Sequence, residues 1–366
     1  MGYTGLRRSW FKLLVRSSVF ALVLVGALAP AAPASADEGR FNRAGNILIA
    51  DQFNNRVIEI DRHHNIVWQF GVGPGDLTAS SILGVNDAQR VGDLTLMAGT
   101  GIPPNTVQAP ACTDPGGCAD NRVMLVNRSG KIVWHYGTFG VTGSGPDELN
   151  TPVQDTYLPN GDILITDQAN ERIIEVNRDK EIVWQYGMTG TIGLPSAGDN
   201  FLNNPNSAEL LENGHILISD ENNNRAIEVN RDKHILRTFT AKGSVSGVAF
   251  ASRLENGNTL LTDSNNSRIV EVNAADQVVW QYQTDTGTNA SPLPTRAVRL
   301  RNGHTLISDQ FNHRVIEVTR QGKIVFTEGV LNQLGIGGRL LNSPYDAKVI
   351  GDYTGLTPPF DEEGEH

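Results

Sequence analysis

Three aspartates and one arginine lie at or beside matching positions of a sequence that repeats itself, each near the start of a different repeat unit. Asp87, Asp155 and Asp346 carry carboxylates, and carboxylate oxygens are the ligands that hard cations such as Ca²⁺ prefer. Arg296 would instead neutralise these carboxylates or bind an anionic group. If the fold brings the four side chains together, the sequence predicts either a divalent-cation site with Lewis-acid chemistry or a charged ligand site.

The repeat units can be aligned on a Pro and on the Asn-Gly pair. Equivalent residues of the aligned units then form columns, and two adjacent columns contain the three aspartates and Arg296. The second column is Ala in five units and Asp155 in the third. The first column is polar in all but one unit and varies from unit to unit, whereas positions that only pack should repeat. This asymmetry favours a ligand site, and a water-filled channel with solvated side chains is the alternative. The first column consists of Asp346, Asp87, Gln154, Ser207, Phe250 and Arg296. The predicted ligand-binding residues are Asp87, Gln154, Asp155, Ser207, Arg296 and Asp346. Among them, the predicted metal ligands are Asp87, Asp155 and Asp346.

The repeat unit indicates which elements position these residues. Asn160-Gly161-Asp162-Ile163-Leu164-Ile165-Thr166-Asp167 begins a phrase that returns near Gly45, Gly214, Gly257 and Gly303, with a degenerate copy at Gly92. Short β-branched runs alternate with Asn-Gly and Asn-Arg-Asp turns, and no stretch shows helical periodicity. A unit of about 45 residues with four short antiparallel strands has the size of a propeller blade.

The ends of the repeat region predict how the ring closes. The first unit lacks its own first strand, whereas residues 342–350 after the sixth unit resemble the start of the other blades. A C-terminal strand that completes the N-terminal blade would remove two exposed sheet edges. The predicted fold is therefore all-β, a closed six-bladed β-propeller of four-stranded antiparallel blades over residues 37–351.

Two phrases in this region carry a family resemblance. Asp51-Gln52-Phe53-Asn54-Asn55-Arg56-Val57-Ile58-Glu59-Ile60 and its counterpart at 309–318 resemble NHL-repeat propellers, and the Ile-Val-Trp endings are more loosely similar to bacterial arylsulfotransferase and quinoprotein propellers. The resemblance implies the fold. It does not select a function, because such propellers include binding modules, lyases and lactonase-like hydrolases.

The residues that recur in nearly every unit are interpreted as structural. Asp51 and Arg56 exemplify a pair, five residues apart, that would close a tight turn through a bidentate ion pair. An enzyme is expected to have one active site, so we interpret an Asp–Arg pair that recurs in nearly every unit as structural and not catalytic. We interpret Trp68, Trp134, Trp184 and Trp280 as packing between blades, with an aromatic ligand cage as the alternative. His215 and His304 follow Asn-Gly turns, where solvated side chains are expected.

The first 36 residues have the pattern of an export signal. Basic residues precede an apolar run at 19–29, and Ala34-Ser35-Ala36 fits a cleavage site. Arg7-Arg8 also fits a twin-arginine signal, so the two export routes stay open. We expect residues 1–36 to be removed after Ala36, residues 352–366 to form an acidic tail, and the mature protein to be secreted, periplasmic or on the cell surface. The net charge of −10 argues against nucleic-acid binding, and no later segment is apolar enough for a membrane span.

The second unit contains a large insertion at about residues 99–120, rich in Pro and Gly. Cys112 and Cys118 lie inside it, and we expect them to form a disulfide in an oxidising compartment. The predicted topology places the insertion beside the axial residues, as a lid or recognition loop. A tolerated insertion without function is the alternative.

These observations favour a monomeric binding or scaffolding module over an enzyme. The expected ligand is a protein, peptide, glycan or small molecule at the face that carries the insertion. No H-E-x-x-H, G-x-S-x-G or phosphate-binding loop is present. The first alternative is a metal-assisted lyase or lactone-type hydrolase using the three aspartates, and the second is an arylsulfotransferase.

Overall fold

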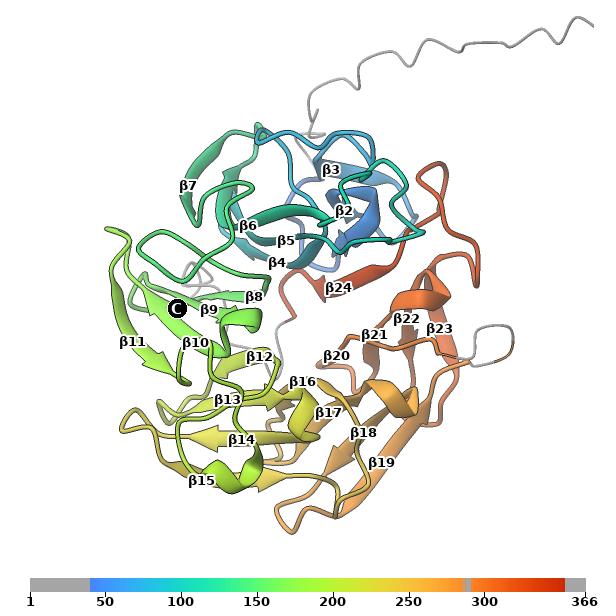
Figure 1. The fold of residues 1–366 in the computed structure, drawn as a ribbon. Helices are drawn as coiled ribbons and strands as arrows, with labels where there is room; N and C mark the ends of the chain where they lie inside the picture. Colours follow the sequence, from blue (N-terminus) through green and yellow to red (C-terminus); the bar gives the residue numbers. More distant parts are fainter. Residues whose placement is uncertain (1–39, 286, 288–290, 353–366) are drawn as a thin grey trace, which may run out of the picture. The chain divides into compact units, whose positions relative to one another are not determined.

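The chain folds as six four-stranded antiparallel sheets around a common axis, which confirms the predicted six-bladed β-propeller (Figure 1). The computed structural model describes residues 40–285, 287 and 291–352. The predicted signal sequence and all but the first residue of the predicted acidic tail lie outside the described residues.

The blades follow the repeat units along the chain, and each contributes its first strand to the axis. Blade 1 consists of β24 (Pro344–Val349), β1 (Ile47–Asp51), β2 (Arg56–Ile60) and β3 (Ile66–Phe70). Blade 2 consists of β4 (Val85–Val91), β5 (Leu94–Ile102), β6 (Cys118–Asn127) and β7 (Ile132–Tyr136). Blade 3 consists of β8 (Pro152–Tyr157), β9 (Ile163–Asp167), β10 (Arg172–Val176) and β11 (Ile182–Tyr186).

The remaining blades have the same order of strands. Blade 4 consists of β12 (Pro205–Leu210), β13 (Ile216–Asp220), β14 (Arg225–Val229) and β15 (Ile235–Phe239). Blade 5 consists of β16 (Val248–Arg253), β17 (Thr259–Asp263), β18 (Arg268–Val272) and β19 (Val278–Gln283). Blade 6 consists of β20 (Arg296–Arg299), β21 (Thr305–Asp309), β22 (Arg314–Val318) and β23 (Ile324–Gly329).

The ring closes through its C-terminal strand, as the sequence predicted. β24 pairs antiparallel with β1, and Val349 lies opposite Ile47. Figure 1 shows the red β24 beside the blue strands of blade 1. The first blade therefore contains strands from both ends of the propeller, and β1 is paired on both of its sides.

The cores lie between neighbouring blades. One cluster combines Leu48 and Val57 of blade 1 with Met97 and Met124 of blade 2, all nearly inaccessible to solvent. The predicted inter-blade role of the tryptophans is confirmed, because each indole N–H donates to a carbonyl of the next blade. Trp68 donates to Arg128 over 2.9 Å, and the other three do so to Arg178, Arg231 and Arg320.

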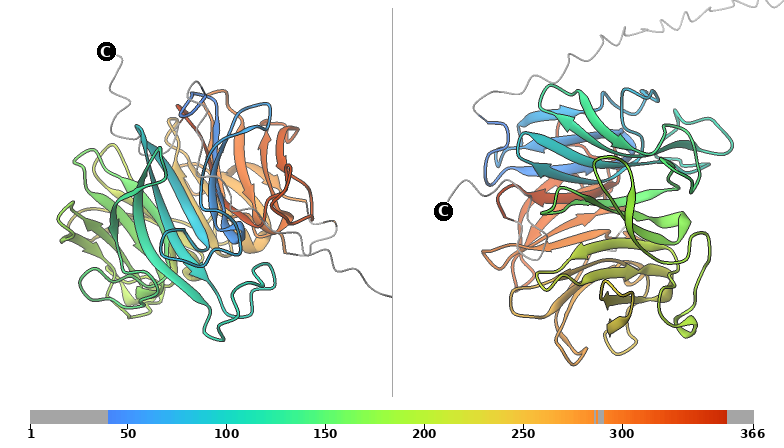
Figure 2. Two further views of the ribbon diagram at one scale, coloured as in Figure 1. Left: turned by 90° about the horizontal axis from the view of Figure 1, so that it is seen from above. Right: turned by 90° about the vertical axis from the view of Figure 1, so that its left-hand side faces the viewer.

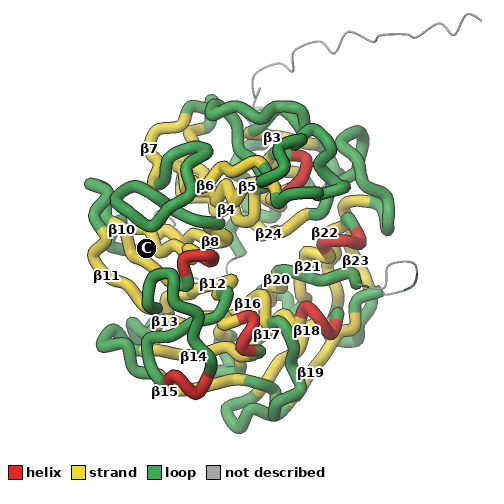
Figure 3. Tube along the Cα trace, in the orientation of Figure 1, coloured by secondary structure: helices red, strands yellow, loops and turns green. Residues whose placement is uncertain are grey.

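Short 3₁₀ turns link the second and third strands of five blades, and Figure 3 shows them in red. They are η1 (Gln52–Asn54), η2 (Gln168–Asn170), η4 (Glu221–Asn223), η5 (Ser264–Asn266) and η6 (Gln310–Asn312), while η3 (Pro195–Ala197) lies in a loop. We call the face that carries these turns the top face. The loops that enter each blade lie on it too, because the fourth strand of each blade ends there and the next first strand begins there (Figure 2).

The recurrent Asp and Arg close these turns, but not through the bidentate pair that the sequence suggested. Arg56 Nε donates to Asp51 Oδ2 over 2.7 Å. Asp51 Oδ1 instead accepts the backbone N–H of Asn342, in the loop that leads into β24. Asn54 completes the turn by donating to Asp51 Oδ2 and to the carbonyl of Gly335. The carboxylate thus joins a turn to the connecting loop above it, which explains why it recurs.

Candidate functional site: a charged cluster on the axis and an apolar top face

The six residues of the first predicted column occupy equivalent positions in the six blades. Each lies opposite the second-strand residue that precedes the recurrent Asp, or Gly99 in blade 2. Their partners across the strand pair are Ala50 for Asp346, Ala98 for Asp87, Thr166 for Gln154, Ser219 for Ser207, Thr262 for Phe250 and Ser308 for Arg296. The sequence alignment of the units therefore has the correct register.

Lys348, which is not among the predicted site residues, brings two of the predicted aspartates together. Its ammonium lies 3.0 Å from Asp87 Oδ1, contacts Asp346 Oδ2, and donates to the carbonyl of Ala88 over 2.9 Å. All four residues are buried. Burial disfavours the charged amine, but the carboxylates of Asp346 and Asp87 outweigh this effect and raise the pKa of Lys348. The available signal was its place two residues after Asp346, which puts both side chains on one face of the strand.

Asp155 joins this cluster from blade 3. It is the one acidic residue of the alanine column, and it is only 2% exposed. Neither of its carboxylate oxygens has a hydrogen-bond partner among the described residues. Burial, followed by the proximity of Asp87, raises the pKa of Asp155 well above its usual range. Burial likewise raises the pKa of Asp87 to about 6, although Lys348 opposes the shift.

Three members of the variable column perform one repeated structural task. Their side chains accept the backbone N–H of the alanine in the next blade. Asp346 accepts from Ala88, Gln154 from Ala208, and Ser207 from Ala251, over 3.3, 2.6 and 3.3 Å. Different side chains thus make the same inter-blade contact, so variation at these positions is not by itself evidence for a ligand.

Arg296 lies away from direct contact with the carboxylates. Its guanidinium donates to the carbonyls of Val153, Asn206, Ala249 and Thr295 over 3.1–3.3 Å, and so links blades 3, 4, 5 and 6. The guanidinium carbon lies 5.1 Å from the ring centres of both Phe250 and Tyr345. The side chain is 1% exposed. Lys348, rather than Arg296, therefore supplies the positive charge that contacts Asp87 and Asp346.

This arrangement bears on the predicted metal site. Within the described residues, no group of three or more His, Cys, Asp or Glu side chains is arranged to hold a metal ion. The Lys348 ammonium occupies the position between Asp87 and Asp346 where a cation would otherwise bridge them. The residues present fit a buried ion-pair cluster better than a divalent-cation site.

A layer of amide side chains covers the axis on the top face. Gln310 donates to Gln52, and Gln52 donates to Asn86, each over 2.8 Å. On the opposite side of the axis, Asn206 hydrogen-bonds the hydroxyl of Tyr345 and donates to Glu221 over 2.8 Å. The side chains come from blades 1, 2, 4 and 6, and they lie on the turns and first strands. The amides are at most 6% exposed, so their donors and acceptors serve contacts within the ring.

Exposed apolar side chains gather in the loops of the same face. Ile192 and Leu194 are 66% and 61% exposed in the loop from blade 3 to blade 4. Val72 and Leu334 are half exposed, and Ile336 lies directly against Gly73. Val107, in the blade 2 loop, is 82% exposed, and the remaining exposed apolar side chains of the described residues are divided between other connecting loops and the outermost strands of the blades. Asn223 donates to the carbonyl of Gly193 over 2.8 Å and fastens the first of these loops to the turn below it.

The insertion in blade 2 is shorter as a loop than predicted, because β5 and β6 extend into it. Ile102 and Cys118 are opposite each other in the strand pair, which leaves residues 103–117 as the loop. This loop packs on Phe53 of blade 1 and Phe311 of blade 6. Figure 1 shows it crossing in front of blade 1. It belongs to the top face, as expected, but it extends across the first and last blades.

The predicted disulfide between Cys112 and Cys118 is present, with the two Cα atoms 5.9 Å apart. Disulfides persist in oxidising compartments, which indicates an extracellular or equivalent setting. Within the described residues, no helix has the length and apolar character needed to cross a membrane.

The histidines make structural contacts. Nδ1 of His215 and of His304 lies 2.8 and 2.7 Å from a glutamate of the same blade, so these side chains are paired rather than simply solvated. His313 accepts the N–H of Ser343 through Nδ1. The asparagines at the equivalent position, such as Asn55, make the same contact with the next loop.

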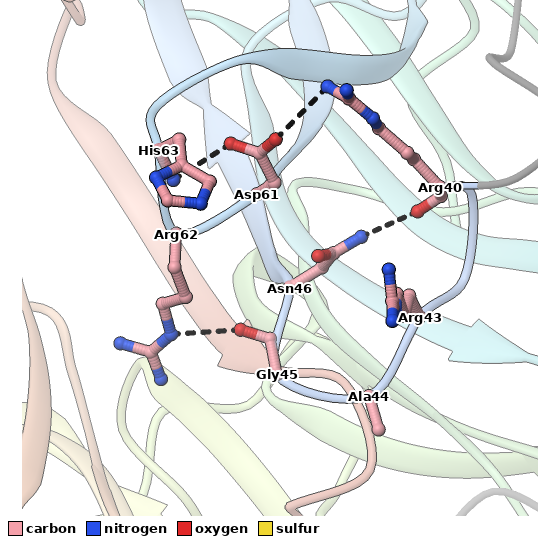
Figure 4. A pocket seen from close by; sticks show the side chains of 8 residues that line it. All are labelled: Arg40, Arg43, Ala44, Gly45, Asn46, Asp61, Arg62 and His63. Carbon is pink, nitrogen blue, oxygen red and sulfur yellow. Dashed lines mark hydrogen bonds and ion pairs between the residues drawn. The ribbon is translucent and has the colours of Figure 1, made fainter.

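A separate pocket of roughly 360 Å³ lies on the opposite face, where β1 begins and β2 meets β3 (Figure 4). Arg40, Arg43, Arg62 and His63 line it together with Asp61. Arg40 approaches Asp61 at 3.5 Å, and Arg62 donates to the carbonyl of Gly45. The pocket is distant from the predicted site and involves none of its residues.

Comparisons with known proteins support the fold and leave the function open. No known family model matches the sequence, and no curated protein does. A protein of unknown function from Bacteroides caccae is structurally similar, with a TM-score of 0.55, 15% identity, and coverage of 83% of this chain and 98% of that one. A streptogramin B lyase structure has a TM-score of 0.52 and 13% identity, covering 81% and 82%.

A structure of a nidogen/laminin complex is also similar, with a TM-score of 0.53, 11% identity, and coverage of 86% and 99%. At these identities the likeness establishes a shared propeller fold alone. The resemblance to NHL-repeat propellers therefore remains a prediction at the level of family.

Proposed function

We propose that this protein is an exported binding module that captures a peptide or an extended protein segment on its top face. The observation that carries the proposal is the exposure of large apolar side chains in loops of the top face. Ile192 and Leu194 are 66% and 61% exposed two residues apart in one loop, and Val107 is 82% exposed in the blade 2 loop, whereas soluble monomers mostly expose such residues singly. Export follows from the predicted signal sequence and agrees with the disulfide.

The layer of amides at the top of the axis has a structural role in this proposal. Gln52, Gln310 and Asn86 are 5%, 6% and 3% exposed and hydrogen-bond one another, so they join the blades beneath the ligand. The apolar loops would contact side chains of the ligand. The charged residues of the axis lie below this layer, so in this proposal they support the site without contacting the ligand.

A selection with a defined library tests the proposal. Random peptides displayed on phage are selected on the mature protein, and the affinity of each selected peptide is measured by fluorescence polarisation. The top-face variant combines Ile192→Ser and Leu194→Ser. The matched control combines Val183→Ser and Val279→Ser on the outermost strands, where the exposure is similar.

We expect selected peptides to lose at least about tenfold in affinity for the top-face variant, about 1.4 kcal/mol, and to keep their affinity for the control. Equal losses in both variants, or no selected peptide, would overturn the proposal. A glycan array probed with the same proteins distinguishes a sugar ligand, because glycan binding without peptide binding assigns the top face to a different ligand class.

The enzymatic alternatives have less support from the geometry. A metal-assisted lyase or hydrolase would need the three aspartates to face a bound ion, whereas Lys348 lies between two of them. For an arylsulfotransferase-like reaction, His313 is engaged in a contact between blade 6 and the closing loop.

A further inference from the structure

The loop of blade 2 contacts the part of the ring where the chain closes. Phe53 belongs to η1 of blade 1, and Phe311 belongs to η6 of blade 6. Phe53 shares one apolar cluster with Ile102 and Ala109 of blade 2, which are 4% and 1% exposed, and Phe311 packs against this cluster. The loop from blade 2 thus extends past its direct neighbour, blade 1, and shares one apolar cluster with the last blade.

Asn342 forms the polar half of this contact. It lies immediately before the closing strand β24, and its side-chain amide donates to the carbonyl of Gln108 over 2.8 Å. Its backbone N–H donates to Asp51 Oδ1, and its carbonyl accepts from Phe53 N–H over 3.1 Å. One residue therefore connects the closing segment both to the first blade and to the loop of blade 2.

The disulfide supports the same cluster. Cys112 and Cys118 pack against Phe53, Ile102 and Ala109, and their bond ties the middle of the loop to its base, where Cys118 lies opposite Ile102. A restrained loop loses less conformational entropy when it packs than a free loop does. The bond is thus placed where it favours the packed position of the loop.

We propose that residues 103–117 form a strap that fastens the last blade to the first, as a second closure of the ring in addition to β24. Pairing of β24 with β1 closes the sheet of blade 1, whereas the strap holds blades 1 and 6 together from above. Opening between the first and last blades must then break the apolar cluster and the Asn342 contact as well as the strand pair.

The strap is also sensitive to reduction. A dithiol reductant would convert the disulfide to two thiols and itself become a cyclic disulfide, by two thiol–disulfide exchange steps. The freed loop gains conformational entropy, so the packed position is favoured less. The propeller itself keeps its folded blades, because their cores lie between strands that the strap does not contribute.

Hydrogen exchange on a strapless variant tests the inference. Because Ile102 and Cys118 face each other in the strand pair, residues 103–117 can be replaced by the two-residue turn Asn-Gly. Cys118→Ser avoids a free thiol. The control is Phe201→Ala, which loosens a different connecting loop where Phe201 packs on Gly193. Folding of each variant is verified by circular dichroism.

We expect exchange at residues 330–349 and in β1 to accelerate at least about tenfold in the strapless variant, with blades 3–5 unchanged. The Phe201→Ala control should leave residues 330–349 protected. Two milder perturbations, a dithiol reductant on the unaltered protein and Asn342→Ala, should change the same amides in the same direction. Faster exchange confined to residues around the removed loop, with β24 and β1 unaffected, would overturn the proposal.

Discussion

The ammonium of Lys348 on β24 lies 3.0 Å from Asp87 Oδ1 on β4, so a buried ion pair joins the closing strand to the second blade. The same ammonium contacts Asp346 within its own strand. Neither partner is accessible to water, and each charge depends on the other for compensation. Closure of the ring and the charge balance of the axis are therefore linked.

Replacing Lys348 by Met should destabilise the protein by about 3–5 kcal/mol, because two buried carboxylates lose their compensating charge. The measurement is the urea midpoint of unfolding at pH 7. Lys323→Met on an exposed turn serves as the control and should leave the midpoint unchanged. An equal midpoint for Lys348→Met and the parent protein would show that the ion pair contributes nothing to stability.

The axial carboxyls should make stability fall as the pH rises. Burial raises the pKa of Asp155 and raises that of Asp87 to about 6, so the folded state holds protons that the unfolded state has released. This contribution is complete below the unfolded pKa and is lost as the pH rises through the folded values. Asp155→Asn removes one titrating group, so the fall in urea midpoint between pH 5 and pH 8 should become smaller.

The control for this experiment is Asp179→Asn, an exposed position of the same blade. It should leave the pH profile unchanged. An identical profile for the parent protein and Asp155→Asn would contradict the assignment of a raised pKa to this carboxyl. Metal analysis of both proteins also distinguishes a bound cation, because a stoichiometric ion lost on Asp155→Asn would restore the predicted cation site.

Deleting residues 343–366 should unfold the protein rather than remove a dispensable tail. The deletion removes β24 and leaves β1 with an unpaired edge. It also removes Lys348 and Asp346 from the axis. Thermal unfolding followed by circular dichroism provides the measurement, and deletion of residues 353–366 alone is the control. A full-length melting temperature after the longer deletion would show that ring closure does not depend on β24.

The exported protein should begin near Asp37, because Ala34-Ser35-Ala36 meets the small-residue rule for signal cleavage. Intact-mass measurement of protein recovered from outside the cytoplasm tests this directly. A mass that retains residues 1–36 would instead indicate an uncleaved anchor.

The fold was predictable because the repeat displays each blade several times. Six copies of one strand pattern make the assignment of each strand less dependent on any single segment. The first unit lacks a first strand, and the additional strand at 344–349 supplies it. The sequence alignment of the units also placed the axial residues correctly, since Asp87, Ser207 and Arg296 occupy equivalent positions in their blades. The disulfide followed from two nearby cysteines in a chain with an export signal.

The contacts that the axial residues make could not be predicted from the repeat pattern. Lys348 had no repeated counterpart to draw attention to it, although it supplies the positive charge of the cluster. Arg296 was expected to neutralise the carboxylates, whereas its guanidinium bonds four backbone carbonyls of blades 3 to 6. Only as a neighbouring charge does it oppose the effect of burial, which raises the pKa of Asp87. Which side chain crosses a crowded axis depends on the space left by five other blades, and that space is a property of the assembled ring.

The sequence by itself therefore determined the all-β class, the number of blades, the closing strand and the inter-blade place of the tryptophans. Each of these depends on periodicity and local turn chemistry, which every repeat encodes. Only the tertiary structure decided that Lys348 pairs with Asp87, that Asn342 contacts Gln108, and that Phe311 packs against the loop of blade 2. These contacts join residues about two hundred or more positions apart, and no local sequence pattern determines such contacts until the ring has closed.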